Sequence, residues 1–387
     1  MAQYMAGKTT EAAARLTEAL GLRDDFPGSE TARVRLAILA IDPETYDSSD
    51  REILESTINN YPDDLVALTK LGQFEEAQGK EKEAMEAYKR ALKVNPNSLS
   101  AMIGLARLQD DPARALEMAR AAYKLDPNDP EVAAAVGRFA FDAGEYSWAA
   151  SVLQNAARNQ PDNPEIAYDL ANAQYSVGQT QAARVQLEMV QMAGDRFSRG
   201  TEAQQFAELL ELAQDPSRAA SQMETIGAAL EADPDNVPAL MARGVAEAYS
   251  GDTVAAMSDY QNVLEVYPEF SPAIREVALL MADDPIDLED AYSMASKARE
   301  AYPRDTEVAG ALGKLAYLKE DYRRAITLLG EATRGRDATA ECWFYLGITQ
   351  VKSGDAKAGK VALQKAMEMG LPENLRQEAE ILVDGGH

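Results

Sequence analysis

Seven prolines recur along this chain at nearly constant intervals. Neighbouring members are separated by 34, 31, 34, 34 and 35 residues, with one longer gap after Pro161; the series is Pro62, Pro96, Pro127, Pro161, Pro234, Pro268 and Pro303. A period of about 34 residues is typical of stacked helical hairpins, each of which buries its apolar face only by packing on the next. The period therefore predicts an all-α chain without strands, with an extended binding surface rather than one deep pocket.

A fixed set of residue types accompanies the prolines. Between Asp63 and Pro96, small residues alternate with larger ones at Leu71, Gly72, Gly79, Ala84, Tyr88 and Ala91. Small side chains let the two helices of a hairpin approach closely, and larger ones fill the space between them. Proline ends the second helix because it cannot continue the hydrogen-bond ladder. The same register recurs in five further units, for example at Gly137 and at Gly244.

These units resemble tetratricopeptide repeats, and the whole array resembles those of bacterial multi-repeat proteins. The resemblance implies a right-handed superhelical solenoid of about ten antiparallel helix-turn-helix hairpins. Residues 372–383 follow the last unit and place Leu375, Ala379 and Leu382 on one helical face, so we expect a C-terminal capping helix there. The last unit, which ends at 369–373, also resembles the closing repeat of bacterial envelope proteins that serve polysaccharide assembly.

The regularity of the repeats divides the chain into three segments. Residues 1–192 form an N-terminal array whose first repeat is incomplete, because residues 7–19 match only the second half of a unit. We therefore expect the chain to be cut from a longer array. Residues 193–233 fit the register worst, with Gln222 at a position that should be a small alanine. We interpret them as a degenerate repeat and a candidate bend, followed by a C-terminal array over 234–387.

Three expected helix starts combine a capping side chain with a following proline. They are Asp129-Pro130, Asn163-Pro164 and Ser271-Pro272. A side-chain oxygen before a proline at the first helical position is a typical N-terminal signal. Glu131 and Glu165 follow in the first two, where the positive end of the helix dipole favours a carboxylate. Part of the acidic excess of the chain therefore has a structural role.

The chain is strongly acidic, with 64 Asp and Glu residues against 38 Lys and Arg residues and a net charge of −26. Such a charge repels phosphate backbones and anionic lipid, which argues against nucleic acid and against membrane-surface binding. Two interpretations stay open: an acidic solvated surface that keeps a long array soluble, or an acidic groove for a basic partner. The predicted partner is a protein or peptide that binds through an apolar or basic segment.

Little in the sequence points to catalysis, a metal or a cofactor. The single histidine is the terminal His387, so no Ser-His-Asp or Cys-His arrangement is available. The stretch at 6–9 resembles the end of a phosphate loop, but Ala2 stands where that motif needs its first glycine. The stretch from Asp126 to Glu131 lacks the glycine of a calcium loop. We expect a non-catalytic chain without cofactor or metal.

The single cysteine and the hydropathy pattern leave the compartment open. Cys342 stands alone, which excludes an intramolecular disulfide, and it lies in a hydrophobic stretch. The sequence has no run of about 18 apolar residues, so direct membrane insertion is not expected. The first residues lack the basic and apolar regions of a signal peptide. A cytoplasmic protein fits this pattern, and so does a trimmed periplasmic one.

The resemblance also implies which residues face a partner. In tetratricopeptide repeats the first helix of each hairpin lines the concave side, so its groove positions can be carried onto this chain. Tyrosines with a few hydrogen-bonding neighbours anchor partner segments at low entropic cost, whereas packing between repeats is the alternative use of these positions. The candidates are Arg138, Phe141, Tyr168, Asn172, Tyr175, Met241, Lys314, Tyr317 and Phe344, preceded in the first regular unit by Thr69 and Gln73.

Together these features predict a non-catalytic protein–protein interaction scaffold. It would bind an extended peptide or a helix of a partner in its concave groove. An adaptor in cell-envelope or polysaccharide assembly is a special case of this prediction. The alternative is a regulatory region cut from a longer enzyme or signalling protein, which the incomplete first repeat favours. An intrinsic enzyme is the third interpretation.

Overall fold

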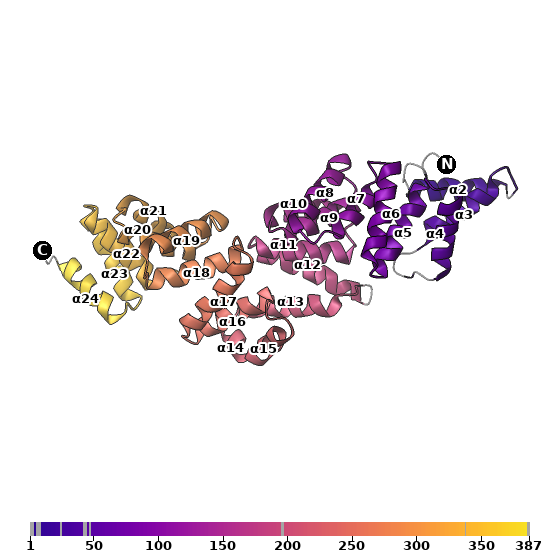
Figure 1. Cartoon of the computed structure of the whole chain (residues 1–387). Coiled ribbons are helices and arrows are strands. Elements are labelled where there is room, and N and C mark those ends of the chain that lie inside the picture. The colour runs from indigo at the N-terminus through magenta and orange to yellow at the C-terminus, as the bar shows by residue number, and fades with distance from the viewer. Residues whose placement is uncertain are drawn as a thin grey trace. The chain divides into compact units, whose positions relative to one another are not determined.

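The chain is seen here as a computed structural model that describes residues 4, 9–23, 25–41, 45, 48–194, 197–336 and 338–384. These residues form helices α2 to α24 and contain no strand (Figure 1). The prediction of an all-α chain is confirmed. Contacts between Cα atoms divide the chain into two compact units, Met1–Leu170 and Ala171–His387. The predicted segment boundaries at 192 and 233 stay predictions.

In the first unit, helices that follow one another in the sequence pack against each other, and the most extensive contacts join α5 to α6 and α9 to α10. Its helices are α2 (Thr9–Leu22), α3 (Ser29–Ala40), α4 (Ser48–Asn60), α5 (Leu65–Ala77), α6 (Glu81–Val94), α7 (Leu99–Arg107), α8 (Pro112–Leu125), α9 (Pro130–Asp142) and α10 (Tyr146–Asn159). Helix α11 (Pro164–Ser176) begins in this unit and ends in the second.

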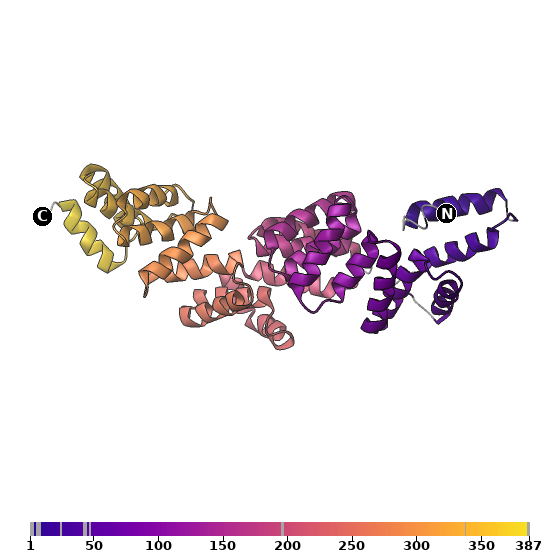
Figure 2. The same ribbon diagram turned by 45° about the horizontal axis from the view of Figure 1, so that its top comes forward.

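The second unit continues with the same succession of helix pairs, which run side by side in both ribbon views (Figure 2). The pairs α16–α17, α20–α21 and α22–α23 have the largest contacts. The helices are α12 (Thr180–Ala193), α13 (Gly200–Leu212), α14 (Pro216–Ser221), α15 (Met223–Ala232), α16 (Val237–Tyr249), α17 (Thr253–Val266), α18 (Ser271–Asp283), α19 (Leu288–Ala301), α20 (Thr306–Leu318), α21 (Tyr322–Ala332), α22 (Ala340–Lys352), α23 (Ala356–Glu368) and α24 (Glu373–Asp384).

Glycines in the first helix of a pair allow the second helix to approach closely. A Cβ atom added at Gly137 would lie 2.3 Å from Cγ of Leu153, and one at Gly72 would lie 2.5 Å from the ring of Tyr88. Both distances are shorter than real Cβ contacts, so any larger residue would force the neighbouring side chain to move. The same pairing joins Gly244 to Tyr260, Gly313 to Leu329 and Gly347 to Leu363. The predicted reason for small residues in the register is confirmed.

The turns between paired helices use left-handed backbone, which favours glycine. Gly79, Gly144, Gly251 and Gly354 have φ values of 70°, 77°, 90° and 98°. Glu320 occupies the corresponding place between α20 and α21 with a φ of 63°. A side chain with a Cβ atom is strained there, because left-handed backbone brings that atom against the following carbonyl oxygen.

Aspartate caps the start of many helices, and the predicted cap at Asp129 is confirmed. Oδ1 of Asp129 accepts hydrogen bonds from the backbone N–H groups of Glu131 and Val132, at 3.0 and 3.1 Å. The expected cap at Ser271 is wrong. Helix α18 already includes Ser271, and Phe270 stands at the capping position without a side-chain hydrogen bond. The Phe270 ring is buried instead.

The degenerate stretch contains an interrupted second helix. Helices α14 and α15 are separated at Gln222, whose φ and ψ of −114° and 27° are not helical. This is the position at which the sequence lacks the small residue of the register. At the other end, α24 confirms the predicted C-terminal helix, and Leu375, Ala379 and Leu382 pack on the apolar cluster around Phe344.

None of the helices in the described part of the chain combines the length and the apolar character that crossing a bilayer requires.

Candidate partner-binding grooves

The first unit carries two adjoining hollows along the first helices of successive pairs. They measure about 300 and about 700 Å³ and share residues of α5 and α7 as well as the start of α9, so they form one continuous surface, named here the first groove. Its lining includes Glu11, Thr69, Lys70, Gln73, Leu99, Ser100, Ile103, Arg107, Asp126, Asp129, Glu131, Arg138, Glu165, Ile166 and Asp169.

The cations of the first groove are engaged within the protein. Arg107 donates two hydrogen bonds to the carboxylate of Glu76, at 2.6 and 3.0 Å. Arg138 lies 3.1 Å from a carboxylate oxygen of Asp169, and Lys70 donates to the backbone carbonyl of Ile41 at 2.6 Å. These cations already have acceptors, and the rest of the lining consists of carboxylates, uncharged polar side chains and apolar side chains.

The second unit has a hollow of about 560 Å³, named here the second groove. Helices α18, α20 and α22 form its walls, and the α13–α14 turn borders it. The small and apolar residues of its lining, among them Leu279, Gly310 and Ala311, are named here its apolar floor. The lining includes Val245, Arg275, Glu276, Leu279, Ala282, Asp283, Glu307, Gly310, Ala311, Lys314, Glu341, Cys342 and Tyr345.

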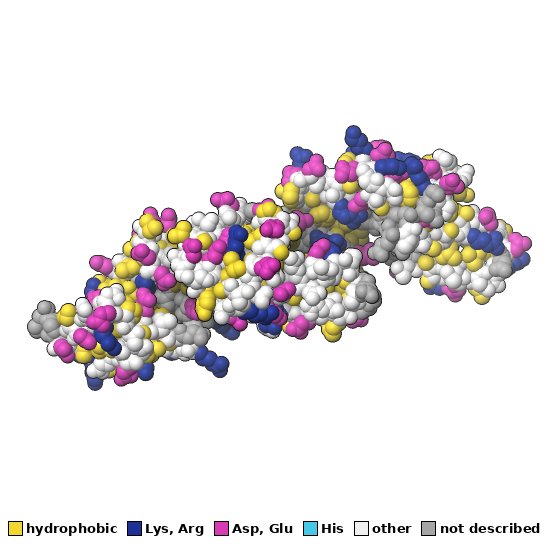
Figure 3. Space-filling model, turned by 90° about the horizontal axis from the view of Figure 1, so that it is seen from below, with side chains coloured by type: hydrophobic (Ala, Val, Ile, Leu, Met, Phe, Trp, Pro, Cys, Tyr) yellow, Lys and Arg dark blue, Asp and Glu magenta, His cyan; other side chains and the backbone are white. Residues whose placement is uncertain are grey.

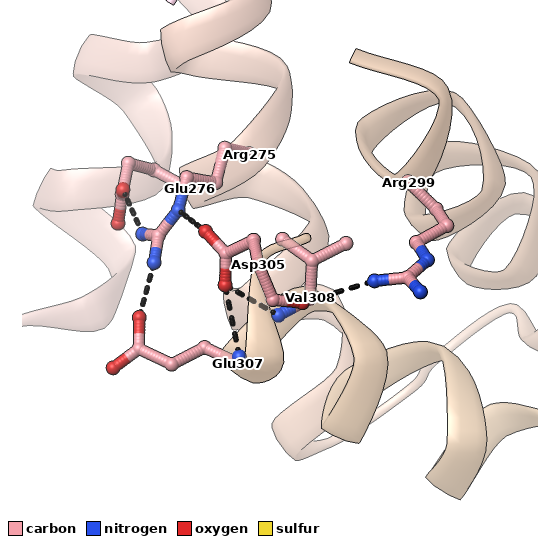
Figure 4. A network of polar contacts seen from close by, with 6 residues as sticks. All are labelled: Arg275, Glu276, Arg299, Asp305, Glu307 and Val308. Carbon is pink, nitrogen blue, oxygen red and sulfur yellow. Dashed lines mark hydrogen bonds and ion pairs between the residues drawn. The ribbon is translucent and has the colours of Figure 1, made fainter. Parts of the chain in front are cut away.

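One end of the second groove is organised around Arg275 (Figure 4). Its guanidinium donates to Oδ2 of Asp305 at 2.7 Å and to Oε1 of Glu276 at 2.6 Å, and it also pairs with Glu307. Oδ1 of Asp305 caps α20 by accepting from the N–H groups of Glu307 and Val308. This arrangement ties α18 to the start of the next pair.

The local environment shifts the pKa values of these carboxyls in opposite directions. Burial raises the pKa of Glu276 above its usual value, and the Arg275 charge opposes this only in part. Burial also acts to raise the pKa of Asp305. There, the hydrogen bond and charge of Arg275 and the donors at the start of α20 outweigh burial, and the pKa lies below its usual value. Asp305 is therefore a firmly ionised counter-ion.

The other end is organised around Lys314, whose side chain is 12% exposed. Its ammonium lies 2.7 Å from a carboxylate oxygen of Glu341 and donates to the backbone carbonyl of Asp283 at 3.1 Å. It also lies 5.3 Å from the ring centre of Tyr345. Burial raises the pKa of Asp283, the nearby Glu341 adds to the shift, and Lys314 opposes it. Four lining carboxyls, Glu276, Asp283, Glu307 and Glu341, thus face two lining cations.

Two of the predicted contact residues line the grooves: Arg138 the first and Lys314 the second. Thr69 and Gln73 also line the first groove. Phe141 is half-buried against Tyr146, with ring centres 5.2 Å apart.

Three further candidates are partly exposed to solvent. Tyr168 and Asn172 in α11 are half-buried. Tyr317 is also half-buried and lies 5.5 Å from Tyr345 by ring centres, so it borders the residues of the second groove.

The other three candidates are core residues. Tyr175, Met241 and Phe344 are 6%, 4% and 2% exposed. Tyr175 illustrates the reason, because its ring lies 5.4 Å from that of Phe206 and 5.5 Å from that of Phe270. At Tyr175, rings from later parts of the second unit cover the position that the repeat register assigns to the groove.

Sequence reasoning missed most of the groove lining, although a local signal was present. Glu131, Glu307 and Glu341 all stand two positions after a capping residue at the start of a first helix. That position places each carboxylate at the border of a groove. The small residues Gly310 and Ala311 carry no such signal, because small residues occur at many packing positions in every repeat.

The described side chains form no arrangement of the kind that binds metal ions. Across the described ranges, no group of three or more His, Cys, Asp or Glu side chains is arranged to hold a metal ion. On the face drawn in Figure 3, acidic and basic side chains are interspersed rather than gathered into patches of one sign.

Several solved structures align with the chain. A tetratricopeptide repeat protein from Parabacteroides merdae ATCC 43184 shares 15% identity, with 83% of this chain and 99% of that chain covered and a TM-score of 0.32. YrrB, described as a tetratricopeptide repeat protein with an unusual peptide-binding site, shares 14% identity over 57% of this chain and 95% of its own, with a TM-score of 0.33. The tetratricopeptide repeat domain of P58(IPK) shares 16% identity over 91% and 96%, with a TM-score of 0.32.

No curated protein matches the chain. Three models of the tetratricopeptide repeat match it, over residues 65–108, 104–164 and 140–205. The matched stretches contain the glycine register and the paired helices described above. Residues 65–205 therefore consist of tetratricopeptide repeats, and such repeats support a scaffold for protein–protein interaction.

Proposed function

We propose that this chain is a non-catalytic scaffold that holds an extended peptide or a helix of a partner protein in its grooves. The observation that carries the proposal is the second groove, where three successive first helices surround an apolar floor between two charged centres. Leu279, Ala311 and Tyr345 supply a surface on which apolar side chains of a partner can pack. The charged groups beside them are engaged in ion pairs and helix caps.

The charge of the grooves supports a partner segment that is apolar or basic. In each groove the cations already have acceptors, while carboxyls outnumber them. A basic residue of a partner would gain from this surplus, and its contribution should weaken as salt screens the charges. An acidic segment would meet repulsion without a free cation to offset it.

The accessible candidates are the proposed contacts of the partner. They fall into a set on α9 and α11 and a set on α20. Tyr175, Met241 and Phe344 are assigned to packing and leave the set of proposed contacts. An adaptor role in cell-envelope assembly remains a prediction from the resemblance of the last unit. The proposed contacts are Arg138, Phe141, Tyr168, Asn172, Lys314 and Tyr317.

The test is a capture experiment with a blocked groove. Ala311→Gln adds a side chain to the floor of the second groove, whereas Ala301→Gln makes the same change at an exposed position at the end of α19. Each variant and the wild type are used as bait in native cell extract, and the bound proteins are identified by mass spectrometry. Circular dichroism confirms that both variants keep their helices.

We expect Ala311→Gln to lose at least one specific protein that the wild type and Ala301→Gln both retain. The captured protein should also elute at lower salt from baits that carry Glu341→Gln, because one groove carboxylate is removed. If all baits capture the same proteins in equal amounts with the fold intact, the second groove is not the binding surface.

A further inference from the structure

One turn of the second unit contacts a distant part of the chain. In a regular array each helix pair packs on its neighbours in sequence. Gly178, between α11 and α12, instead contacts Tyr302, which follows α19. A Cβ atom added at Gly178 would lie only 2.2 Å from the Tyr302 hydroxyl oxygen. The hydroxyl therefore packs directly on the backbone of the turn.

This contact sets Gly178 apart from the other turn glycines. Its φ of 78° is the same left-handed conformation that Gly144 and Gly251 adopt, at 77° and 90°. An added Cβ at either of those two positions would have nothing within 4 Å. Gly178 is therefore constrained twice, by its backbone conformation and by the side chain above it.

Aromatic packing reinforces the same junction. One turn before Gly178, the buried ring of Tyr175 lies between Phe206 and Phe270. Phe270 holds the capping position of α18, where the first helices α16 and α20 have Asn236 and Asp305 with side-chain cap bonds. Helix α18 therefore lacks a side-chain cap, which typically stabilises a helix by about 1 kcal/mol. In its place, the ring of Phe270 contacts Tyr175.

We propose that Tyr175 and Gly178 on one side and Phe270 and Tyr302 on the other form a clasp that closes residues 179–269 into a loop. The clasp is a separable contact: it fixes the α11–α12 turn on α18 and α19, and it can open while the helices remain folded. This goes beyond the proposed function and does not depend on it. Since α18 also carries Arg275 and Glu276, opening the clasp would alter one wall of the second groove.

The test measures the distance across the clasp in the full chain. Spin labels are attached at Gln181→Cys and Arg304→Cys, both exposed, with Cys342→Ser removing the native thiol. Pulsed electron paramagnetic resonance then compares Gly178→Ala with Gly251→Ala in this background. Both substitutions impose the same backbone strain, but only alanine at 178 meets the Tyr302 hydroxyl.

We expect one narrow distance distribution in the labelled parent and in Gly251→Ala. Gly178→Ala should give a broader and longer distribution with unchanged helical circular dichroism. Adding Tyr302→Ala to Gly178→Ala removes the whole ring, including the hydroxyl oxygen, Cζ and Cε1 that the new methyl group meets at 2.2, 2.5 and 2.6 Å. This double variant should narrow the distribution again, because Tyr175 and Phe270 still hold the junction.

Three results would overturn the proposal. The first is the same distribution in Gly178→Ala and Gly251→Ala. The second is failure of Tyr302→Ala to narrow the distribution of Gly178→Ala. The third is loss of helicity in Gly178→Ala, since the contact would then belong to an indivisible core rather than to a clasp that opens by itself.

Discussion

Replacing Gly244 by alanine should destabilise the second unit through the close approach of α16 and α17. The new Cβ would lie 2.5 Å from Cε1 and 2.7 Å from Cζ of Tyr260. That ring is 1% exposed, so it lies in the packed core between the two helices. Forcing an extra carbon into a packed core costs about 1–3 kcal/mol. Alanine at the same time favours the helix by about 1 kcal/mol over glycine.

Gly227→Ala in α15 separates these two terms. It is also a glycine inside a helix of the second unit, but an added Cβ there would have nothing within 4 Å. Alanine at 227 should therefore stabilise the unit by up to about 1 kcal/mol. Since both variants share the helical gain, Gly244→Ala should be less stable than Gly227→Ala by about 1–3 kcal/mol.

Urea unfolding followed by far-ultraviolet circular dichroism gives the two free energies of unfolding. A double-mutant cycle then checks the cause, because Tyr260→Ala removes the ring that the new methyl group meets. In that background Gly244→Ala should behave like Gly227→Ala. Equal stabilities of the two single variants, or no coupling between positions 244 and 260, would refute the packing argument.

Three further predictions concern the turn, the ion-pair network and α11. Glu320→Gly should raise the free energy of unfolding by about 0.5–1 kcal/mol, because relief of left-handed strain exceeds the entropic cost of glycine; no gain in urea unfolding would contradict the strain. Asp305→Asn keeps a capping oxygen but loses the charge. The pKa of Asp305 is lowered in the folded protein. The stabilisation that the Asp305 charge gives the fold should therefore be complete above the ordinary aspartate pKa of 3.8 and disappear as the pH falls through the folded pKa. If the wild type keeps a higher free energy of unfolding than Asp305→Asn below the folded pKa, this reasoning is contradicted. Tyr175→Ala should cost about 3–5 kcal/mol, and Tyr168→Ala clearly less by the same assay; similar losses would show that Tyr175 is no more central to packing.

The paired helices were predictable because their signals are local. The spacing of sixteen positions between Gly137 and Leu153, and between Gly244 and Tyr260, lies within one hairpin and repeats along the chain. Cap residues such as Asp129 are equally local, since the acceptor and its donors lie within three positions. Short-range geometry of this kind can be read from sequence alone.

Whether a groove position is exposed or buried could not be predicted, because its contacts are not local. Tyr168 and Tyr175 stand on one helix and the repeat register assigns both to the groove, yet Tyr175 is buried by Phe206 and Phe270, which come later in the chain. Ser271 has the sequence of a helix cap, but the chain places Phe270 there because its ring contacts Tyr175. Such outcomes depend on contacts between distant residues, which a repeat register does not encode.

The double role of Asp305 has a consequence for how cooperative the array is. One oxygen of its carboxylate starts α20, and the other holds Arg275 of the preceding pair. In a one-dimensional Ising description, the energy of forming a repeat and the energy of coupling it to its neighbour are separate parameters. Here a single carboxylate contributes to both. Loss of the coupling would leave the start of α20 with a more solvated, less oriented cap, so fraying of one pair should spread to the next.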